Sequence, residues 1–358
     1  MINAVLIVRG ARAVEADRVP IPCQQDTHGM ALTNPRVYSI DRPAGRDTVL
    51  GPVAPLVCTV ILNWNRVDLT LDTLASLREQ SYPRLLTIVI DNGSRDQAEA
   101  LTRIKTHYPQ VHLLASKRNL GFAGGCNVGM RRALRLGTDY LLLLNNDVTL
   151  HREAVARLVD ALEADPSAGA AGPLIYFASD PERVWFGGGT VRMGGRVLAV
   201  HDAIGRRVQF AEGTPPRQTH WLPGTAIMAR RSAVERVGLM DPAYFLYWED
   251  VDWCFRFRRA GYKLLFVPGS VIWHKVNAST STMSVPMSNV YYWERNRLRF
   301  IEKWGTWDSK LIAMTKVLWR LLAWQVRPPP DDPQAHVKLE AYRDYLLRRF
   351  GPRRRPAS

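Results

Sequence analysis

The 358-residue chain has few cysteines and no long apolar run, and each shortage excludes a class of protein. The four cysteines are scattered, with neither a CxxC pair nor zinc-like spacing: Cys23, Cys58, Cys126 and Cys254. We therefore expect buried thiols in a reducing, cytosolic setting rather than a disulfide framework. No stretch reaches the roughly eighteen apolar residues that a membrane-spanning helix needs. The apolar start, Met1 to Val8, precedes its positive charges, which is the reverse of a signal peptide, so we expect the protein to stay inside the cell.

Acidic side chains are also scarce relative to basic ones. The 48 lysines and arginines outnumber 33 aspartates and glutamates, which gives a net charge of +15 and a pI near 10.0. This balance predicts an anionic partner: a phosphorylated substrate, an anionic membrane surface or nucleic acid. Hydrophobic and charged contents of 46% and 23% are typical of a folded protein. The length allows one large α/β domain with appendages, or two smaller domains.

The most informative stretch is Tyr140 to Asp147. Five apolar residues, Tyr140 to Leu144, are typical of a strand that is buried on both faces of a parallel sheet. The run ends in Asn145, Asn146 and Asp147, and ligands bind beyond the carboxyl ends of such strands. A carboxylate there suits Mg²⁺ or Mn²⁺ shared with a diphosphate. The same three residues are also compatible with a simple turn and helix cap.

The first half of the chain alternates strands with helices. Residues 1 to about 52 have no sustained period and are expected to form a loosely ordered extension. Strands are then predicted at 57–63, 85–90, 111–115, 140–144 and 168–175, with helices at 67–80, 98–107, 120–136 and 155–162. This order predicts a twisted, mostly parallel, Rossmann-like sheet with helices on both faces. Polar residues follow four of the strands, as a nucleotide site at the sheet edge requires, although any loop is also polar.

A glycine-rich segment, Asn119 to Asn127, precedes one of these helices. Such a loop lets the backbone approach a phosphate or ribose closely, and a helix start supplies free N–H donors. Glycine loops also serve as plain tight turns, so this signal is weak by itself. After Tyr176 the glycine-rich, β-rich texture predicts hairpins in a smaller antiparallel region, with a strand in Trp221 to Ala229 and others at Lys263 to Val267 and Val271 to His274.

Three acids stand at the start of a helix that closes at Gly261. Glu249, Asp250 and Asp252 follow a dense aromatic run from Tyr244 to Trp248. Capping and the helix dipole explain one or two of these acids. Acids walled by aromatic rings are also candidates for a raised pKa and for general-base catalysis.

The end of the chain carries an apolar segment with interspersed cations, Leu311 to Trp324. It is too short and too charged to span a bilayer, but it suits a helix lying in a membrane interface. The alternative is a helix that packs on the catalytic domain. Arginines at 348–349 and 353–355 add a candidate site for anionic lipid.

Seven segments, taken in this order and spacing, resemble the inverting family-two glycosyltransferases of the GT-A fold, in particular the rhamnosyltransferase-like bacterial branch. These segments are Leu62-Asn63-Trp64-Asn65, Asp91-Asn92-Gly93-Ser94, Asn119 to Gly125, Asn145-Asn146-Asp147, Pro223-Gly224-Thr225, Phe245 to Asp252 and Trp273-His274. The resemblance covers about Val57 to Trp304. It implies a catalytic domain at 53–305, with a nucleotide-binding half at 53–175 and an acceptor half at 176–305. Residues 306–358 then form a helical, basic, membrane-associating extension.

The resemblance also implies roles for single residues. Asp91 resembles the acid that reads the nucleobase, with Asn63 and Asn65 beside it. Asp147 and His274 resemble metal ligands, and Asp250 resembles the catalytic base with Glu249 as its neighbour. The remaining donor-binding candidates are Asn119, Gly121, Gly125, Asn127, Asn145 and Asn146. The chain departs from the family's metal-binding triplet at Asn145, where an amide replaces a carboxylate and the site loses a charge.

The implied reaction moves a sugar from a dTDP- or UDP-sugar to a hydroxyl of a glycan, with inversion and with help from Mg²⁺ or Mn²⁺. The implied acceptor is lipid-linked, at the cytoplasmic face of the cell membrane, and nucleic acid is not expected as a partner. Two alternatives come from other classes: a nucleotidyltransferase, and a non-catalytic basic protein that binds membrane or nucleic acid. The first would need a glycine-rich basic loop after the first strand, where Asn63 to Arg66 stand instead. The second does not explain acids at strand ends.

Overall fold

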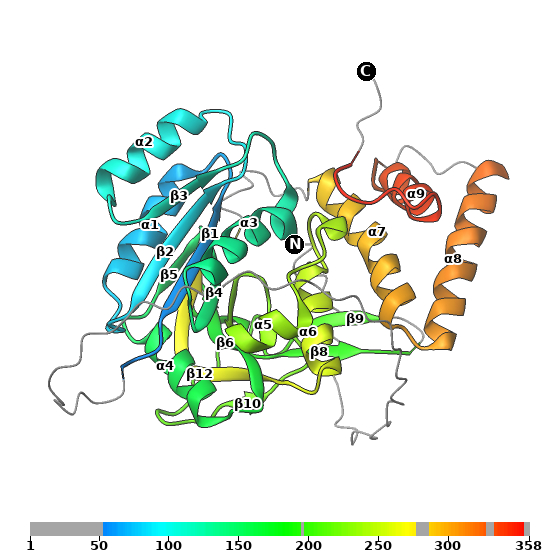
Figure 1. Cartoon of the computed structure of the whole chain (residues 1–358). Coiled ribbons are helices and arrows are strands. Elements are labelled where there is room, and N and C mark those ends of the chain that lie inside the picture. Colours follow the sequence, from blue (N-terminus) through cyan, green and yellow to red (C-terminus); the bar gives the residue numbers. More distant parts are fainter. Residues whose placement is uncertain (1–52, 195–196, 277–285, 327–332, 354–358) are drawn as a thin grey trace, which may run out of the picture. The chain divides into compact units, whose positions relative to one another are not determined.

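A computed structural model describes residues 53–194, 197–276, 286–326 and 333–353. The predicted extension at 1–52 lies outside these residues, as do Arg354 and Arg355 of the terminal arginine cluster. The remainder forms an α/β unit followed by three helices (Figure 1).

The first half alternates strands and helices as predicted. Its elements are β1 (Val57–Asn63), α1 (Val67–Arg78), β2 (Leu85–Asp91), α2 (Gln97–His107), β3 (His112–Ala115), α3 (Gly121–Arg135), β4 (Tyr140–Asn145), β5 (Val148–Leu150), α4 (Ala154–Ala164) and β6 (Ala168–Phe177). The apolar run of β4 is buried from Tyr140 to Leu144, because the strand lies inside the sheet with layers on both faces.

The second half supplies an antiparallel strand and the remaining edge of the sheet. Its elements are β7 (Asp180–Phe186), β8 (Gly189–Arg192), β9 (Leu198–His201), β10 (Arg217–Gln218), β11 (Ala226–Arg230), α5 (Arg231–Val237), the 3₁₀ turn η2 (Pro242–Tyr244), α6 (Glu249–Arg259) and β12 (Lys263–His274). The predicted hairpin region is present as the β8–β9 pair. The expectation of two strands in 263–274 is wrong: β12 is one strand, whose register with β6 shifts between Val267 and Val271.

Within the described residues, the central sheet has ten strands and runs β10-β12-β6-β11-β4-β1-β2-β3, with β5 added on β12 and β7 on β6. Strands β4, β1, β2 and β3 are parallel neighbours, and β12 is parallel to β6. Between β12 and β3, β11 interrupts this direction, because it pairs antiparallel with both β4 and β6. The strands β10, β5 and β7 also pair antiparallel, with β12, β12 and β6. The predicted mostly parallel sheet is therefore confirmed.

The two faces of β1 explain why helices cover both sides of the sheet. Thr70 of α1 donates a hydrogen bond to the side chain of Asn63 on one face. On the other face α3 comes so close that a Cβ at Gly125 would overlap Leu62, and one at Gly129 would overlap Val60. Part of the predicted phosphate loop is thus wrong as a loop: Gly124 and Gly125 lie inside α3, and at Gly125 the absence of a side chain permits close helix–strand packing.

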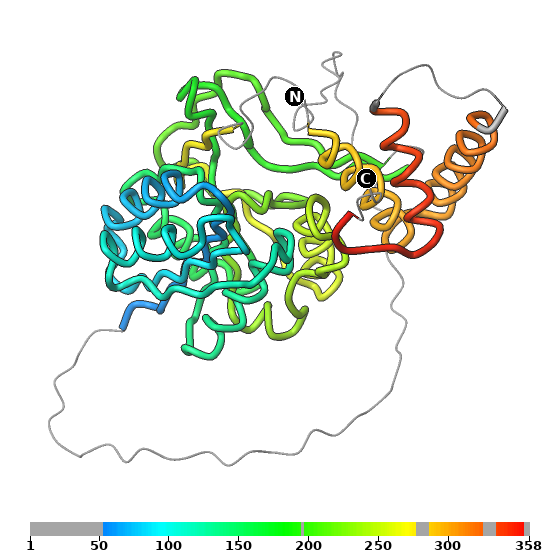
Figure 2. Tube along the Cα trace, turned by 90° about the horizontal axis from the view of Figure 1, so that it is seen from above, coloured from blue at the N-terminus to red at the C-terminus, as the bar shows by residue number. Residues whose placement is uncertain are grey.

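Three helices follow the sheet: α7 (Met287–Trp304), α8 (Trp307–Val326) and α9 (Pro333–Leu346). Figures 1 and 2 show α8 and α9 beside α7. Val317 of α8 is buried with Leu298 of α7 and Tyr342 of α9. Across the described part of the chain, we find no helix whose length and apolar content suit it to cross a bilayer. The predicted C-terminal helices are present, and the domain boundary at residue 305 stays a prediction.

Candidate functional site

The parallel strands bring several of the predicted site residues to one edge. Asn63, Asp91 and Asn145 end β1, β2 and β4, which are aligned in register with Asn63 opposite Asp91. His274 ends β12, which runs in the same direction. Because the carboxyl ends of parallel strands meet at the same end of the sheet, these side chains lie at that end.

Asp91 is fully buried and lies at the centre of a hydrogen-bond network. Its carboxylate accepts bonds from Asn63 Nδ2 and Gln97 Nε2, both at 2.7 Å, and from the hydroxyl and backbone N–H of Ser94 at 2.7 and 2.9 Å. The network fixes the carboxylate and holds the ends of β1 and β2 together. Contact with a nucleobase would require one of these donors, Gln97 or Ser94, to give way.

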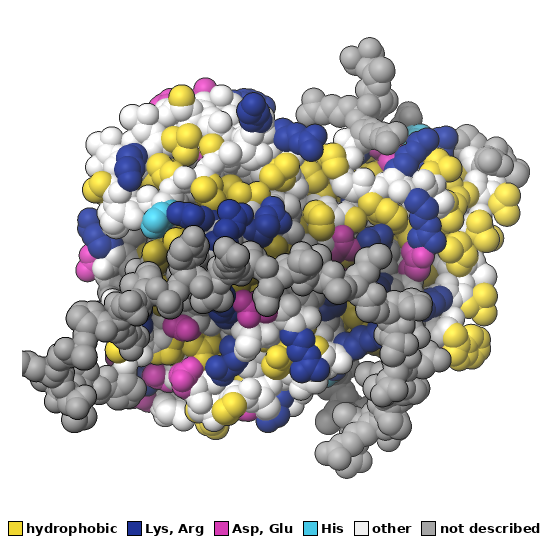
Figure 3. All heavy atoms as spheres, viewed as in Figure 1, with side chains coloured by type: hydrophobic (Ala, Val, Ile, Leu, Met, Phe, Trp, Pro, Cys, Tyr) yellow, Lys and Arg dark blue, Asp and Glu magenta, His cyan; other side chains and the backbone are white. Residues whose placement is uncertain are grey.

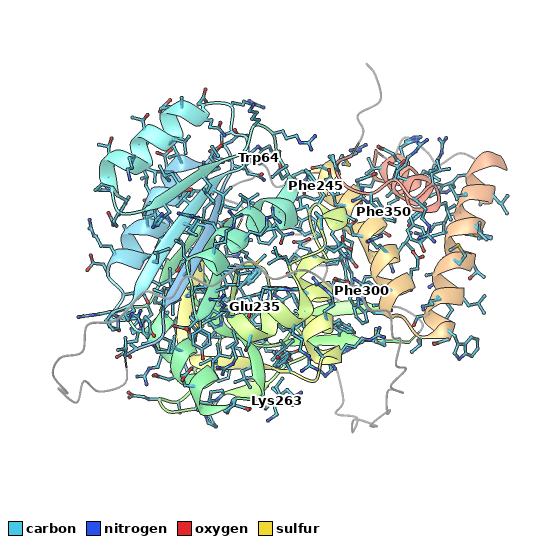
Figure 4. The ribbon with its side chains drawn as sticks, in the orientation of Figure 1. Trp64, Glu235, Phe245, Lys263, Phe300 and Phe350 are labelled. Atoms are coloured by element: carbon cyan, nitrogen blue, oxygen red, sulfur yellow. The ribbon has the colours of Figure 1, made fainter. Side chains whose placement is uncertain are left out.

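The segment between Asn63 and Asn65 forms the rim beside Asp91. Asn65 has a left-handed backbone (φ 57°), and its N–H donates to Ser94 Oγ while its side chain accepts from Arg95 N–H. This turn leaves the Trp64 side chain 51% exposed at the edge of the sheet (Figure 4). An exposed indole beside a buried, polar strand end offers a flat surface for a ring.

The N-terminus of α3 is not free to bind a phosphate in the way the sequence predicted. Asn119 accepts a hydrogen bond from the N–H of Gly121 and another from Asn92. The next N–H, of Phe122, donates to the carbonyl of Phe245 at 2.6 Å. Gly121 has φ +75°, and a Cβ there would overlap Phe245. This glycine therefore serves the contact between α3 and the loop before α6.

The structure gives Asn127 and Gly125 packing contacts. Both amide atoms of Asn127 bond to the backbone of Met240, its Nδ2 to the carbonyl and its Oδ1 to the N–H. Gly125 faces Leu62 and the Asn92 side chain. Neither residue presents a free polar group to the sheet edge, so their predicted donor contacts have no support in this geometry.

Asn145 and Asn146 hold the end of β4 in place. The Asn145 N–H donates to the carbonyl of Thr225 at 2.9 Å, which joins β4 to the start of β11. The Asn146 side chain donates to Thr70 Oγ1 at 3.0 Å. The Asn145 side chain is only partly buried and stays beside the predicted metal ligand, Asp147.

Asp147 and His274 meet because β5 folds back antiparallel on the end of β12. Val148 pairs with His274, and Lys275 N–H donates to the carbonyl of Asp147. This pairing brings Asp147 Oδ1 within 3.2 Å of His274 Nε2, with both side chains buried. The edge of the Trp185 indole, with its centroid 4.8 Å away, closes one side of the imidazole.

This pair fits a divalent metal. Within the described ranges, Asp147 Oδ1 and His274 Nδ1 are buried without a hydrogen-bond partner, so the 3.2 Å contact does not satisfy the carboxylate oxygen. A carboxylate oxygen and an imidazole nitrogen are donors that Mn²⁺ accepts readily. No third His, Cys, Asp or Glu joins them among the residues described. Two protein ligands leave positions for a diphosphate and water.

Asp250, the predicted base, is held by backbone donors at the same edge. Gly224 N–H donates to its Oδ2 at 2.9 Å and Val251 N–H to its Oδ1 at 2.8 Å. Gly224 precedes β11, whose Ala226 pairs with Leu144 of β4. Loss of solvent raises the pKa of Asp250, while the two N–H donors oppose that rise.

Glu249 points elsewhere. Its side chain is 4% exposed, and Oε2 has no hydrogen-bond partner among the described residues. Loss of solvent raises the pKa of Glu249 well above its ordinary value, and the charge of Asp250 adds to the rise. Burial thus disfavours the charged form of Glu249, and Asp250 is the partly exposed acid of the pair.

Asp252 has the structural role expected from its place in the first turn of α6, but through side-chain partners. It is fully buried and accepts hydrogen bonds from Trp304 Nε1 at 2.7 Å and Tyr244 OH at 3.2 Å. It also pairs with Arg256 and Lys303, at 3.2 and 2.8 Å. Asp252 thereby joins α6 to α7.

Sequence reasoning missed three contributors to this edge. Ser94 and Gln97 bond to Asp91, and Gly224 holds Asp250 through its backbone N–H. Ser94 and Gly224 stand in segments that carried the resemblance, which was the available signal. Gln97 gives no such signal, because a glutamine at a helix start is ordinary.

A mostly parallel sheet with one inserted antiparallel strand, and carboxylates gathered at its carboxyl edge, is the arrangement expected of a GT-A fold. A model of the family named Glycosyl transferase family 2 matches residues 58–238, half of the chain. The chain belongs to this family, and it is a glycosyltransferase. This membership replaces the two alternatives that the sequence left open.

Curated relatives support the same family. An N-acetylglucosaminyl-diphospho-decaprenol L-rhamnosyltransferase from Mycobacterium tuberculosis is 30% identical over 238 residues, covering 58% of this chain and 72% of the relative. The dTDP-rhamnosyl transferase RfbF of Shigella flexneri is 22% identical over 255 residues, covering 69% of this chain and 80% of the relative. A rhamnosyltransferase-like branch of family 2 is thus confirmed.

Solved structures agree on the fold. GalNAc-T7 with UDP, GalNAc and Mn²⁺ aligns with a TM-score of 0.55 at 17% identity, over 82% of this chain and 56% of that one. TarS 1-349 of S. aureus aligns with a TM-score of 0.50 at 11% identity, over 82% of each chain. At these identities the likeness concerns the fold alone.

Proposed function

We propose that the protein transfers rhamnose from a dTDP- or UDP-sugar to a hydroxyl of a lipid-linked glycan, with inversion at the anomeric carbon. The similarity to the mycobacterial rhamnosyltransferase, 30% over 238 residues, is the observation that carries the substrate class. The name of that relative specifies a polyprenyl diphosphate sugar as acceptor, and the Shigella relative is named for a dTDP-sugar.

The donor nucleotide would lie across the ends of β1, β2 and β4. Asp91, held by Asn63 and Ser94, is the proposed contact for the base, and Trp64 offers a surface on which the base could stack. Asn145 would reach the ribose or a water near the diphosphate. Asn65, Asn119 and Asn146 act on this side as supports, because each is bonded to neighbouring backbone or side chains.

Asp147 and His274 would hold Mg²⁺ or Mn²⁺, and their mixed donor set favours Mn²⁺. When bound, such an ion offsets the charge that develops on the departing diphosphate. These two residues would hold such an ion at the end of β12.

Asp250 would remove the proton from the acceptor hydroxyl. The hydroxyl oxygen then bonds to the anomeric carbon while the bond from that carbon to the diphosphate oxygen breaks, and the nucleoside diphosphate leaves with the electron pair. Of the Glu249–Asp250 pair only Asp250 is partly exposed, so Glu249 is not open to the sugar as a nucleophile. A single displacement of this kind inverts configuration.

The exposed face of α8 supports a place on the cytoplasmic surface of the membrane. Five large apolar side chains are exposed along it: Trp307, Leu311, Leu318, Trp319 and Leu322. Figure 3 shows hydrophobic side chains gathered along the edge that α8 forms. The opposite face of α8 packs on α7 and α9. Packing on the protein therefore accounts for this buried face, and contact with a membrane is proposed for the exposed face. Lys310 and Lys316 are exposed on the same helix and would meet anionic lipid.

We assign each proposed role to one continuous segment of the chain. Residues 53–175 would bind the nucleotide, 176–305 would supply the base and the acceptor site, and 306–358 would approach the membrane. Each part is assigned by the residues already named rather than by a break in the fold.

Transfer with purified full-length protein tests the proposal. The protein is incubated with Mn²⁺ or Mg²⁺, a polyprenyl-diphospho-GlcNAc acceptor and, in parallel, dTDP-rhamnose and several UDP-sugars. We expect transfer from dTDP-rhamnose, with the product linkage inverted when read by NMR couplings. Release of nucleoside diphosphate without a linked product, or a retained linkage, would contradict the proposal.

A further inference from the structure

The loop that delivers the base has an unusual backbone. Three bulky residues immediately before α6 have left-handed φ angles: Phe245 (65°), Tyr247 (68°) and Trp248 (73°). Side chains with a Cβ rarely adopt this region, and such conformations persist where surrounding contacts over-determine them. Glu249 and Asp250 follow directly, so whatever holds this loop also sets the position of Asp250.

Asn296, in the middle of α7, holds the loop from one side. Its side chain is fully buried, and its Nδ2 donates to the carbonyls of Tyr244, Leu246 and Tyr247 at 2.6, 2.8 and 3.0 Å. The two N–H groups of this amide are thus shared among three carbonyls of the loop. A helix would leave these carbonyls bonded to their own chain, so the contact belongs to this loop conformation.

Arg295 extends the same support to the end of the chain. It is fully buried, and its Nη2 donates to the carbonyls of Ala243 and Tyr244 at 3.3 and 3.2 Å. Its Nη1 donates to the carbonyl of Gly351 at 2.8 Å, and its Nε to Asn296 Oδ1 at 3.0 Å. Gly351 N–H returns a bond to Ala243. The residues beyond α9 are therefore part of the support.

Aromatic contacts complete this support. Phe245 stacks on Tyr292 of α7, with ring centroids 5.0 Å apart, and Phe350 lies under the guanidinium of Arg299 at 4.4 Å. Figure 4 labels Phe245 and Phe350, both beside α7. The buried guanidinium of Arg295 meets carbonyls and aromatic rings rather than a carboxylate. Burying such a charge costs free energy unless the geometry of these contacts is kept.

We infer that Arg295 and Asn296 are positioning residues for Asp250, and that the segment after α9 is part of the active-site support. The inference rests on the proposed role of Asp250 as the base. It assigns the C-terminal region a role in catalysis, separate from any contact that α8 makes with a membrane.

The test compares Asn296→Asp with Asn289→Asp. Asn296→Asp keeps the shape but replaces the NH₂ that serves three carbonyls with a carboxylate oxygen, which repels them. We expect kcat to fall about 10- to 100-fold, as a displaced catalytic group predicts, with nucleotide affinity within twofold of wild type. Asn289 lies in the first turn of α7, where its side chain accepts a bond from Ser288, and its variant should keep wild-type kcat.

Two further measurements separate positioning from loss of folding. In an Asp250→Asn background, Asn296→Asp should lower the residual transfer by less than twofold, because the group that it positions is gone. A chain ending at Leu347 loses the carbonyls of Arg349 and Gly351 while α7 stays intact, and its kcat should fall about tenfold or more.

Specific outcomes would overturn the inference. It fails if Asn296→Asp transfers at the wild-type rate, or if kcat, nucleotide affinity and melting temperature fall together, or if the loss in the Asp250→Asn background is as large as in wild type. Absence of transfer by the wild-type protein would instead refute the proposed function, and the two failures are thereby distinguishable.

Discussion

Gly224 donates its backbone N–H to Asp250 Oδ2 at 2.9 Å, and this bond joins the start of β11 to the start of α6. The bond matters because β11 is fixed in the sheet by β4 and β6 on either side. The carboxylate in the first turn of α6 is thereby held against a strand that is fixed in the sheet. A side-chain substitution cannot remove this main-chain donor. The orientation of Asp250 therefore depends on the turn at Gly224 as well as on the contacts from α7.

The first prediction concerns the base. Asp250→Asn keeps shape and removes basicity, so turnover should fall by about 10²–10⁴, while nucleotide affinity stays near wild type. Turnover is measured by product formation, and affinity by calorimetry with the nucleoside diphosphate. A further sign is the acid limb of the kcat profile: because burial raises the pKa of Asp250 above its ordinary 3.8, activity should rise with pH through that raised value.

Two neighbouring acids provide matched controls. Glu249→Gln should cost less activity than Asp250→Asn, because burial already disfavours the charged form of Glu249. Asp252→Asn should chiefly lower stability, by on the order of 3 kcal/mol, because it leaves two cations beside a neutral buried group. Near wild-type transfer by Asp250→Asn together with loss in Glu249→Gln would show that the base is misassigned by one residue.

The second prediction uses the buried proton of Glu249. Burial raises its folded-state pKa well above the ordinary 4.5, so between these values the folded chain holds a proton that the unfolded chain has lost. The folded state then binds more protons, and its stability falls as pH rises from about 4.5. Glu249→Gln removes this loss. Its melting temperature should equal that of wild type near pH 4.5 and exceed it increasingly toward neutral pH.

Melting curves over this pH range decide the matter. A constant difference between Glu249→Gln and wild type at every pH would mean that Glu249 ionises in the folded protein. Asp250→Asn, measured in parallel, controls for the charge next to it.

The third prediction concerns the metal. Asp147→Ala should abolish the divalent-dependent part of nucleotide binding, and His274→Ala should weaken it less, since the carboxylate carries the charge. Calorimetry with and without Mn²⁺ measures both effects. His151→Ala is the matched control, because His151 is exposed and lies at the other end of β5. Unchanged metal-dependent affinity in Asp147→Ala would remove Asp147 from the site.

The elements that could be predicted from the sequence are those whose signal is local. The apolar run of β4 and the polar residues at the ends of β1, β2 and β4 were enough to predict the sheet and the polar residues along its carboxyl edge. The pairing of Asp147 with His274 could not be foreseen from spacing, because it depends on β5 folding against β12, 120 or more residues later in the chain. The resemblance, rather than periodicity, placed these two residues together.

Packing decided the cases where local reasoning was wrong. The glycines of Asn119 to Asn127 indicate close approach, and local sequence cannot say whether a phosphate or a strand approaches. Here Gly125 meets Leu62, and Asn127 bonds to Met240 from a distant part of the chain. The contacts of Arg295 with Ala243 and Gly351 were equally invisible, because each links segments more than fifty residues apart.

The last prediction concerns α8 and replaces a cruder test. Removal of everything beyond about Gly305 should release the protein from anionic vesicles, but it also removes Gly351 and its bond to Arg295, so it would disturb the loop before Asp250.

The triple variant Leu311→Ser, Trp319→Ser and Leu322→Ser changes only exposed positions on one helix. Because each large apolar side chain gains about 1.5–3 kcal/mol on burial, vesicle binding should weaken at least tenfold, while melting temperature and transfer to a detergent-dispersed acceptor stay unchanged. Val53→Ser is the control, since Val53 is 68% exposed outside this helix. Lys316→Ala should weaken binding by about 1 kcal/mol, and only at low salt. Vesicle co-sedimentation measures all of these, and a triple variant that still pellets like wild type would show that α8 does not face the membrane.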